Sequence, residues 1–286
     1  MATLATVNEP IQQLNFDDHL IALWLFTHHS HHTQRAYKAD IERLRQFVHK
    51  PLNQVSLEDL IEFSKSLSDL GEQSRYRTIC AIKSFFRFAH QTGRYQFDVG
   101  EALTVPNPPD NLAYRILPEE DIRHLLDAAK SERDKVLLEL LYASGIRVAE
   151  LCGLRVQDLF ARGDSGQITV HGKGDKIRSI LLPNGVWNEL VHLTSGKLPH
   201  ERVFGISESQ VWRIVKKTAK LAGVDGRISP HWFRHAHGSH ALDHGAPLHL
   251  VQATLGHVSI STTGRYLHAR PQDSSGSYLT LEGYNG

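Results

Sequence analysis

Apolar residues recur every three to four positions through the first third of the chain, which is the period of a helix with one buried face. Thr33, Ser56 and Ser74 stand where they can cap three such helices, and Gly93 follows the last helix. The expected apolar faces contain Leu20, Leu23 and Trp24, then Tyr37, Ile41 and Leu44, then Leu57, Leu60, Ile61 and Leu67, and finally Ile79, Ile82, Phe85 and Phe86. This pattern predicts a compact four-helix domain over residues 15–93.

The helical period fails between residues 94 and 117. Pro106, Pro108 and Pro109 lie close together in this stretch, and proline continues neither a helix nor the hydrogen-bond ladder of a sheet. We therefore expect 94–117 to be a linker, followed by a second domain over 118–286.

The second domain is expected to mix helices with two short strands. Pro118 suits the first turn of a helix, and the run VLLELLYASG predicts a buried helix that ends at Gly145. The runs QITVHG and KIRSILLP alternate as strands do, and GKGDK between them predicts a hairpin turn. Further helices are expected over 207–222, 230–244 and 247–255 and around Tyr266. The expected fold is mainly α, with a small antiparallel β-sheet in a mostly helical second domain.

Composition narrows the class of protein. Hydrophobic residues make up 41% of the chain and charged residues 22%, and no apolar run approaches the ~20 residues of a membrane-spanning helix. The first residues lack the basic and apolar regions of a secretory leader, so we expect a cytoplasmic protein with no membrane partner. Two cysteines are too few for a disulfide framework or a structural zinc site, and no metal is expected.

Charge is nearly balanced, with 32 Lys and Arg residues against 31 Asp and Glu residues. The total therefore does not indicate a nucleic-acid partner. The basic residues are nevertheless clustered, since one stretch contains Arg75, Arg77, Lys83, Arg87 and Arg94 and another contains Arg213, Lys216, Lys217 and Lys220. Such clusters either bind phosphates or are solvated faces of helices.

Side chains that can carry out chemistry recur in short motifs of the second domain. They are Arg147 in ASGIRVAEL, Lys173 in HGKGDKIR, His231 and Arg234 in PHWFRHAH, His257 in TLGHVS and Tyr266 in STTGRYLHA. Each alone has a commoner structural explanation: an arginine at a helix start usually forms a surface ion pair, and a single tyrosine is usually a half-buried anchor. Together they supply a nucleophile, donors for phosphoryl oxygens and an acid for a departing hydroxyl, which breaking and rejoining DNA requires.

In order and spacing these motifs resemble those of the tyrosine recombinase (phage integrase) family. That family has G-[LI]-R-x-x-E-L, a hairpin lysine, H-x-x-R-H, L-G-H and a tyrosine nine positions after the last histidine, and each has a counterpart here. The resemblance covers about residues 118–270, and the helical segment before it is similar to the family's core-binding domain. It implies a site-specific DNA recombinase that acts through a 3′-phosphotyrosyl intermediate, in integration and excision or in dimer resolution.

The resemblance implies a role for each matching residue. Arg147 and Arg234 would bind the non-bridging oxygens of the scissile phosphate, for which a guanidinium fork is well suited. Tyr266 would attack the phosphorus, and Lys173 would protonate the leaving 5′ oxygen. Because the tyrosyl ester retains the energy of the broken bond, no cofactor is expected.

Two histidines would assist the reaction. His231 would help to remove the proton from Tyr266, and His257 would form a hydrogen bond with the phosphate. Gly264 and Arg265 depart from the family, which often has less flexible and less basic residues there. We therefore expect the helix with Tyr266 to be loosely held until DNA and a partner protomer are bound.

DNA binding is expected on both domains. In the first, the helix over about 74–91 is expected to face a groove with Arg75, Arg77, Lys83 and Arg87. The implied partners are double-stranded DNA with a specific recombination site, and a homo-tetramer on two such sites in which the tail over 271–286 docks on a neighbour. The need for an accessory protein is left open.

Two other functions remain open on the sequence alone. A type IB topoisomerase uses the same phosphotyrosyl chemistry but relaxes supercoils without a cognate site. A DNA-binding recombination factor would have lost catalysis, although every catalytic position is filled. Among recombinases, the missing N-terminal arm-binding domain favours a Xer-like resolver over an integrase of a mobile element, without excluding the latter.

Overall fold

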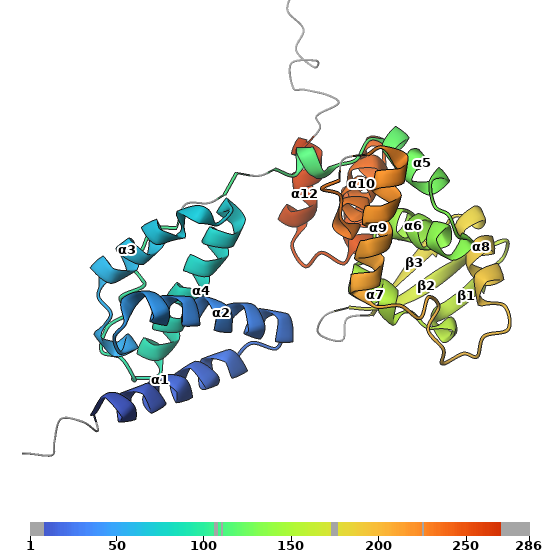
Figure 1. Ribbon diagram of the computed structural model, residues 1–286. Coiled ribbons are helices and arrows are strands. Elements are labelled where there is room, and N and C mark those ends of the chain that lie inside the picture. Colours follow the sequence, from blue (N-terminus) through green and yellow to red (C-terminus); the bar gives the residue numbers. More distant parts are fainter. Residues whose placement is uncertain (1–8, 106–107, 110, 173–176, 225, 270–286) are drawn as a thin grey trace, which may run out of the picture. The chain divides into compact units, whose positions relative to one another are not determined.

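The computed structural model describes residues 9–105, 108–109, 111–172, 177–224 and 226–269. The chain divides into two compact units, Met1–Pro109 and Asp110–Gly286 (Figure 1). Each unit has its own hydrophobic core. Within the described ranges, no helix combines the length and the apolar character needed to cross a membrane.

The first unit is helical throughout its regular elements. These are α1 (Glu9–Phe26), α2 (His31–Val48), the 3₁₀ turn η1 (Leu52–Gln54), α3 (Leu57–Ser66), the 3₁₀ turn η2 (Leu67–Asp69) and α4 (Glu72–Gln91). Trp24 of α1 joins three helices, because its ring stacks on Tyr37 of α2 and meets Phe85 of α4 edge to face. Its indole N–H also donates to Ser84 Oγ at 3.2 Å. The predicted helical domain is thus held around a buried aromatic centre.

Two helices begin a few residues earlier than the sequence pattern suggests. Helix α2 is capped by Ser30, whose Oγ accepts a hydrogen bond from the backbone N–H of Thr33, so Thr33 is inside the helix rather than its cap. Helix α4 follows Gly71, whose carbonyl oxygen accepts hydrogen bonds from the N–H groups of Ser74 and Arg75. The first turn of α4 is therefore closed by the backbone, without a capping side chain.

The segment over 94–117 is packed onto the two units. Tyr95 and Leu103 are buried in the core of the first unit, whereas Leu112 and Ile116 are buried in a cluster of the second. The division between the units falls within this segment, after Pro109. Residues near both ends of the expected linker therefore contribute apolar side chains to the units.

The second unit is mostly helical with a small sheet, so the predicted fold class is confirmed (Figure 1). Its elements before the sheet are η3 (Ala113–Arg115), α5 (Glu119–Asp127), α6 (Glu132–Ser144), α7 (Val148–Gly153) and η4 (Val156–Asp158). The strands are β1 (Leu159–Arg162), β2 (Ser165–His171) and β3 (Ile177–Leu182). The later helices are α8 (Asn184–Thr194), α9 (Glu208–Ala222), α10 (Pro230–Asp243), α11 (Leu248–Leu255) and α12 (Ile260–Ala269).

The sheet is antiparallel in the order β1-β2-β3. In the register of β2 and β3, Ile168 lies opposite Ile180 and Val170 lies opposite Arg178. Helix α8 covers the sheet with Trp187, whose ring is so close to Gly166 that a Cβ added there would lie 2.1 Å from it. The strands QITVHG and KIRSILLP are thereby confirmed, whereas the turn between them lies outside the described residues.

Two glycine turns set the direction of the chain beside the motifs that contain Arg147 and His257. Helix α6 ends at Gly145 with φ of 60°, and α11 ends at Gly256 with φ of 66°, a left-handed conformation that favours glycine. Gly145 is also crowded, because an added Cβ would lie 2.7 Å from Leu255 and 2.8 Å from His237. Arg147 follows the first of these turns, at a position that the turn fixes.

Gly145→Ala is expected to lower the free energy of unfolding by ~2–4 kcal/mol, since it adds backbone strain to a steric clash. Gly163→Ala is the matched control, because Gly163 has φ of 58° but no atom within 4 Å of an added Cβ. The control is expected to lose only the strain, about 1–2 kcal/mol. Urea denaturation measures the free energy of unfolding of both variants. Equal losses in the two variants would show that crowding around Gly145 does not contribute to the effect.

Candidate active site

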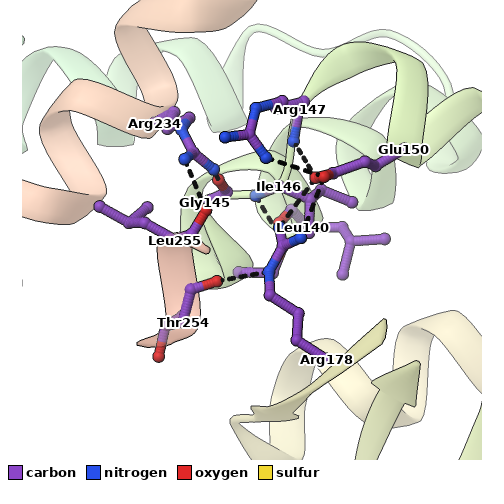
Figure 2. Close-up of polar contacts among 10 residues, drawn as sticks. Leu140, Gly145, Ile146, Arg147, Glu150, Arg178, Arg234, Thr254 and Leu255 are labelled. Carbon is purple, nitrogen blue, oxygen red and sulfur yellow. Dashed lines mark hydrogen bonds and ion pairs between the residues drawn. The ribbon is translucent and has the colours of Figure 1, made fainter. Parts of the chain in front are cut away.

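Arg147 precedes the first residue of α7 and is held by a carboxylate of the same turn. Its backbone N–H donates to Glu150 Oε2 at 2.8 Å, and its guanidinium NH1 donates to Glu150 Oε1 at 3.0 Å (Figure 2). The Glu150 side chain is 5% exposed, whereas that of Arg147 is 39% exposed. The arginine is therefore anchored at its backbone while its guanidinium remains accessible to a ligand.

Arg234 lies on α10 and is almost completely buried, at 4% exposure. It donates from NH1 to the carbonyl oxygen of Gly145 at 2.5 Å and from NH2 to that of Leu255 at 2.6 Å (Figure 2). These carbonyls close the C-terminal ends of α6 and α11, where helices concentrate negative partial charge. Burial, followed by the charge of Arg147, lowers the pKa of Arg234 to about 10, so the guanidinium stays charged at neutral pH.

Tyr266 is packed among side chains of its own unit, at 4% exposure. Its hydroxyl forms a hydrogen bond with Nδ1 of His235 at 3.0 Å. Its ring lies nearly parallel to that of His257, with 6.4 Å between the centroids. Gly238 of α10 also lies against the Tyr266 ring, because a Cβ added there would come 2.9 Å from it. The three motifs around His235, His257 and Tyr266 therefore meet at one phenol ring.

The expectation that the Tyr266 helix is loosely held is wrong in this DNA-free structure. Thr263 is completely buried, and its Oγ1 forms a hydrogen bond with Nδ1 of His257 at 2.9 Å. Thr263 and Tyr266 form the packed face of α12, while an added Cβ at Gly264 would meet open space. Because a side chain at position 264 would contact nothing, the glycine removes no packing contact between α12 and the rest of the unit.

The histidines near Tyr266 are uncharged at neutral pH. Burial, followed by the charge of Arg234, lowers the pKa of His257 to about 4. Burial, followed by electrostatic repulsion from His231, lowers the pKa of His235 to about 4. The pKa of His231 is also lowered, first by desolvation and then by Arg234 and Arg147. Because these imidazoles are neutral, the positive charge of the site comes from its arginines. A neutral imidazole also has a nitrogen that can accept a proton.

The hydroxyl of Tyr266 is a weak acid in this state. Burial raises its pKa above the ordinary value, while the charges of Arg234 and Arg265 oppose the rise. A phenolate at this buried position would need additional positive charge nearby, and the proton of the hydroxyl would have to pass to a base. Deprotonation of Tyr266 therefore has to be coupled to the reaction.

Three guanidinium groups and one carboxylate influence one another at this site. Arg147 and Arg178 both contact Glu150, and the charges of these two arginines reach Arg234 as well. These four groups sum to a formal charge of 3 − 1 = +2. Arg147 and Glu150 line a cavity of about 380 Å³, and His231 and His235 line a separate cavity of about 660 Å³. The arrangement suits a phosphoryl group that gains negative charge as it reacts.

The remaining predicted residues are distributed as follows. Lys173 lies outside the described residues, between β2 and β3. On α4, Arg77 forms a two-pronged ion pair with Asp40, and Lys83 Nζ donates to the carbonyl oxygens of Glu101 and Leu103. Arg75 is half-buried, and Arg87 is 59% exposed with Asp98 at 3.9 Å. Arg77 and Lys83 thus have structural partners within the first unit.

Two residues of the site were not assigned a role in it from the sequence. Arg178 alternates with exposed neighbours and shares the inward face of β3 with Ile180 and Leu182, so a charge on a buried face was the available signal. His235 is the second of these residues, and it is the histidine that contacts the Tyr266 hydroxyl. Its position one helical turn after His231 was the signal for it.

Metal ligands do not gather at this site or elsewhere in the part of the chain that the structure describes. No group of three His, Cys, Asp or Glu side chains there could hold a metal ion.

Family models and curated relatives match nearly the whole chain. The model of the phage integrase family matches residues 115–273, and that of the phage integrase N-terminal SAM-like domain matches residues 16–93. A tyrosine recombinase of Pseudothermotoga lettingae is 34% identical over 272 residues, which cover 91% of this chain and 94% of the relative. Tyrosine recombinase XerD of Proteus mirabilis is 34% identical over 287 residues, which cover 91% of this chain and 90% of the relative.

Solved structures share the fold at lower identity. A lambda integrase dimer bound to a COC′ core site aligns with a TM-score of 0.73 and 17% identity, covering 90% of this chain and 77% of that chain. XerH site-specific recombinase bound to its difH substrate aligns with a TM-score of 0.63 and 19% identity, covering 84% of this chain and 75% of that chain.

Proposed function

Given that the chain belongs to the phage integrase family of tyrosine recombinases, we propose that Tyr266 is its nucleophile and that Arg147 and Arg234 bind the scissile phosphate. The chain is a site-specific recombinase that cleaves and rejoins DNA. The packing of Tyr266 between His235 and His257 in the presence of the buried Arg234 is the observation that carries these assignments.

The proposed reaction transfers a phosphoryl group from one oxygen to another and back. The Tyr266 oxygen bonds to the phosphorus of the 3′ phosphate while the bond to the 5′ oxygen breaks. Arg147 and Arg234 stabilise the charge on the non-bridging oxygens, and His257 forms a hydrogen bond with the phosphate. Lys173 protonates the departing 5′ oxygen, a role that rests on the sequence motif. Attack by a 5′ hydroxyl on the ester rejoins the strand, so the chemistry consumes no cofactor.

The proton of Tyr266 has a route through two histidines. His235 Nδ1 lies 3.0 Å from the hydroxyl, and its ring is uncharged. Because a pKa of about 4 makes this ring a weak base, it is proposed to accept the proton only as Tyr266 attacks the phosphorus. His231 lies one helical turn earlier, with 6.4 Å between the two ring centroids, and lines the cavity beside the site. We propose that His231 assists deprotonation through His235 rather than by direct contact.

DNA binding is proposed for basic side chains on both units. On α4 the proposal now centres on Arg75 and Arg87, because Arg77 and Lys83 are engaged with Asp40 and with backbone carbonyls. On the second unit, α9 carries Arg213, Lys217 and Lys220, which are all exposed. Phosphate contacts by such residues make affinity depend on salt concentration.

Arg87→Ala is expected to weaken DNA binding about equally for different sequences and to reduce the slope of log affinity against log salt by ~1. Lys83→Ala is the matched comparison on the same helix. It is expected to lower the melting temperature of the protein with little change in the salt slope, since its ammonium is bound to the carbonyls of Glu101 and Leu103. Fluorescence anisotropy at several salt concentrations measures both slopes. If Lys83→Ala reduced the salt slope and Arg87→Ala did not, Lys83 rather than Arg87 would be the DNA contact.

The assembly and setting of the reaction are also proposed. Solved relatives include a lambda integrase tetramer bound to a Holliday junction. We propose that four copies of this chain act on two DNA sites of specific sequence in the cytoplasm. The predicted docking of the tail lies outside the described residues. Dimer resolution and mobile-element integration both fit this proposal, with or without an accessory protein.

The test uses a suicide duplex from DNA that flanks the gene, nicked near the cleavage point so that the cut strand escapes. The wild-type protein is expected to form an adduct that resists detergent, and with two intact sites to form Holliday junctions. Adducts with relaxation of plain supercoiled DNA, and no junctions, would instead favour the topoisomerase alternative. Salt-sensitive binding without any adduct would favour a silent DNA-binding factor.

A further inference from the structure

Arg178 is the third guanidinium of the site, and it contacts the same carboxylate that holds Arg147. Its NH1 and NH2 donate to Oε1 and Oε2 of Glu150 at 3.0 and 2.8 Å (Figure 2). NH1 of Arg147 donates to that same Oε1 at 3.0 Å. Two arginines on separate elements, β3 and the start of α7, therefore share one buried carboxylate.

Arg178 is the more firmly held of the two. Its Nε donates to the carbonyl oxygen of Thr254 at 2.8 Å. Its side chain also lies against the turn at Gly256, where an added Cβ would come 3.2 Å from Arg178 Cδ. Only 14% of the Arg178 side chain is exposed, compared with 39% for Arg147. Of the two arginines, Arg147 is thus the one that can turn towards a phosphate.

Turning Arg147 towards a phosphate removes one charged partner from Glu150. A carboxylate that is 5% exposed is unfavourable without a cation, so Glu150 would draw Arg147 back if it had no other partner. Arg178 supplies that partner in a two-pronged geometry. Burial raises the pKa of Glu150, but the hydrogen bonds from Arg178 and Arg147 outweigh it and hold the pKa below the ordinary value.

We propose that Arg178 is a positioning residue for recombination, which neutralises Glu150 so that Arg147 can leave this carboxylate for the scissile phosphate. The proposal rests on the function proposed above, because it assumes that Arg147 binds that phosphate. It assigns Arg178 no contact with DNA. The electrostatic role separates it from a residue that merely holds β3 to α11.

The experiment compares single-turnover cleavage of the suicide duplex by the wild type, Arg178→Met, Glu150→Gln and the double variant Arg178→Met/Glu150→Gln. Arg178→Met is expected to cleave ~10–100-fold more slowly, with DNA affinity nearly unchanged. The double variant is expected to recover to within about fivefold of Glu150→Gln alone, because the neutral amide no longer competes with the phosphate for Arg147. Rescue by a second substitution is an outcome that a purely structural role does not produce.

The outcomes separate the two proposals. If the double variant is as slow as Arg178→Met or slower, or if Arg178→Met cleaves at the wild-type rate, the positioning role is overturned while the recombinase assignment stands. If the wild type forms no adduct, the proposed function is contradicted, and the positioning role of Arg178 is contradicted as well. Thermal unfolding confirms that each variant is folded. Should Arg178→Met not fold, Arg178→Lys and Arg178→Lys/Glu150→Gln provide the same comparison, with an expected loss of about 3–10-fold and the same recovery.

Discussion

Tyr266→Phe is expected to abolish the covalent protein–DNA adduct, with cleavage falling by at least about four orders of magnitude because a phenyl ring offers no nucleophile. DNA affinity should stay nearly constant, since phosphate contacts elsewhere dominate binding. The ring still packs against His257 and Gly238, and only the hydrogen bond to His235 is lost. That loss is expected to cost ~1 kcal/mol of stability. Gel electrophoresis in detergent after incubation with the suicide duplex measures the adduct.

Tyr142→Phe is the matched control for Tyr266→Phe. The Tyr142 hydroxyl forms a hydrogen bond with His240 Nδ1 at 2.9 Å, so this variant loses a comparable buried phenol–imidazole contact. It is expected to form the adduct at nearly the wild-type rate. An adduct formed by Tyr266→Phe would contradict the assignment, and mapping the attached peptide would then identify the true nucleophile.

Arg234→Lys is expected to reduce cleavage by about a thousandfold or more, because a single ammonium cannot replace the fork that binds both the phosphate and the helix ends. Arg234→Met should reduce cleavage as much and also lower the free energy of unfolding by ~2–4 kcal/mol, because two buried carbonyl oxygens lose their donor. Those carbonyls belong to Gly145 and Leu255. Single-turnover cleavage and urea denaturation measure the two effects separately.

Arg133→Lys and Arg133→Met control for the loss of an arginine. Arg133 forms an exposed ion pair with Asp134, and both substitutions are expected to leave cleavage unchanged. The role of Arg234 would be disproved by an Arg234→Lys protein that is stably folded and cleaves at the wild-type rate.

Helices could be predicted from the sequence where one face is buried and where the capping residue is adjacent to the first turn. Ser56 and Asp59 form the capping box that their spacing suggests, with the Ser56 N–H donating to the Asp59 carboxylate at 2.7 Å. Strand β1 and helix α8 could not be predicted in the same way. The four residues of β1 are exposed or half-exposed and do not alternate, and α8 begins with Asn184 and Gly185, which are typical of turns.

The sequence predicts the site as a set of motifs but not as a network of contacts. The order of the motifs predicts roles for Arg234 and Tyr266, whereas the contact between Tyr266 and His235 depends on how α12 packs on α10. Lys83 was predicted to contact DNA because it is a basic residue on a helix, but its ammonium has partners within the protein. Those partners are backbone carbonyls 18 and 20 positions away, which no local pattern reveals.

The packing of Tyr266 has a consequence for the division of labour within an assembly. Its hydroxyl contacts His235 and its ring contacts His257, both of its own chain. If Tyr266 is the nucleophile and Arg234 binds the scissile phosphate, as proposed, each protomer is expected to cut the strand to which it is bound, in cis. Within the proposed tetramer, neighbouring protomers are then expected to supply no reactive atoms to that cut.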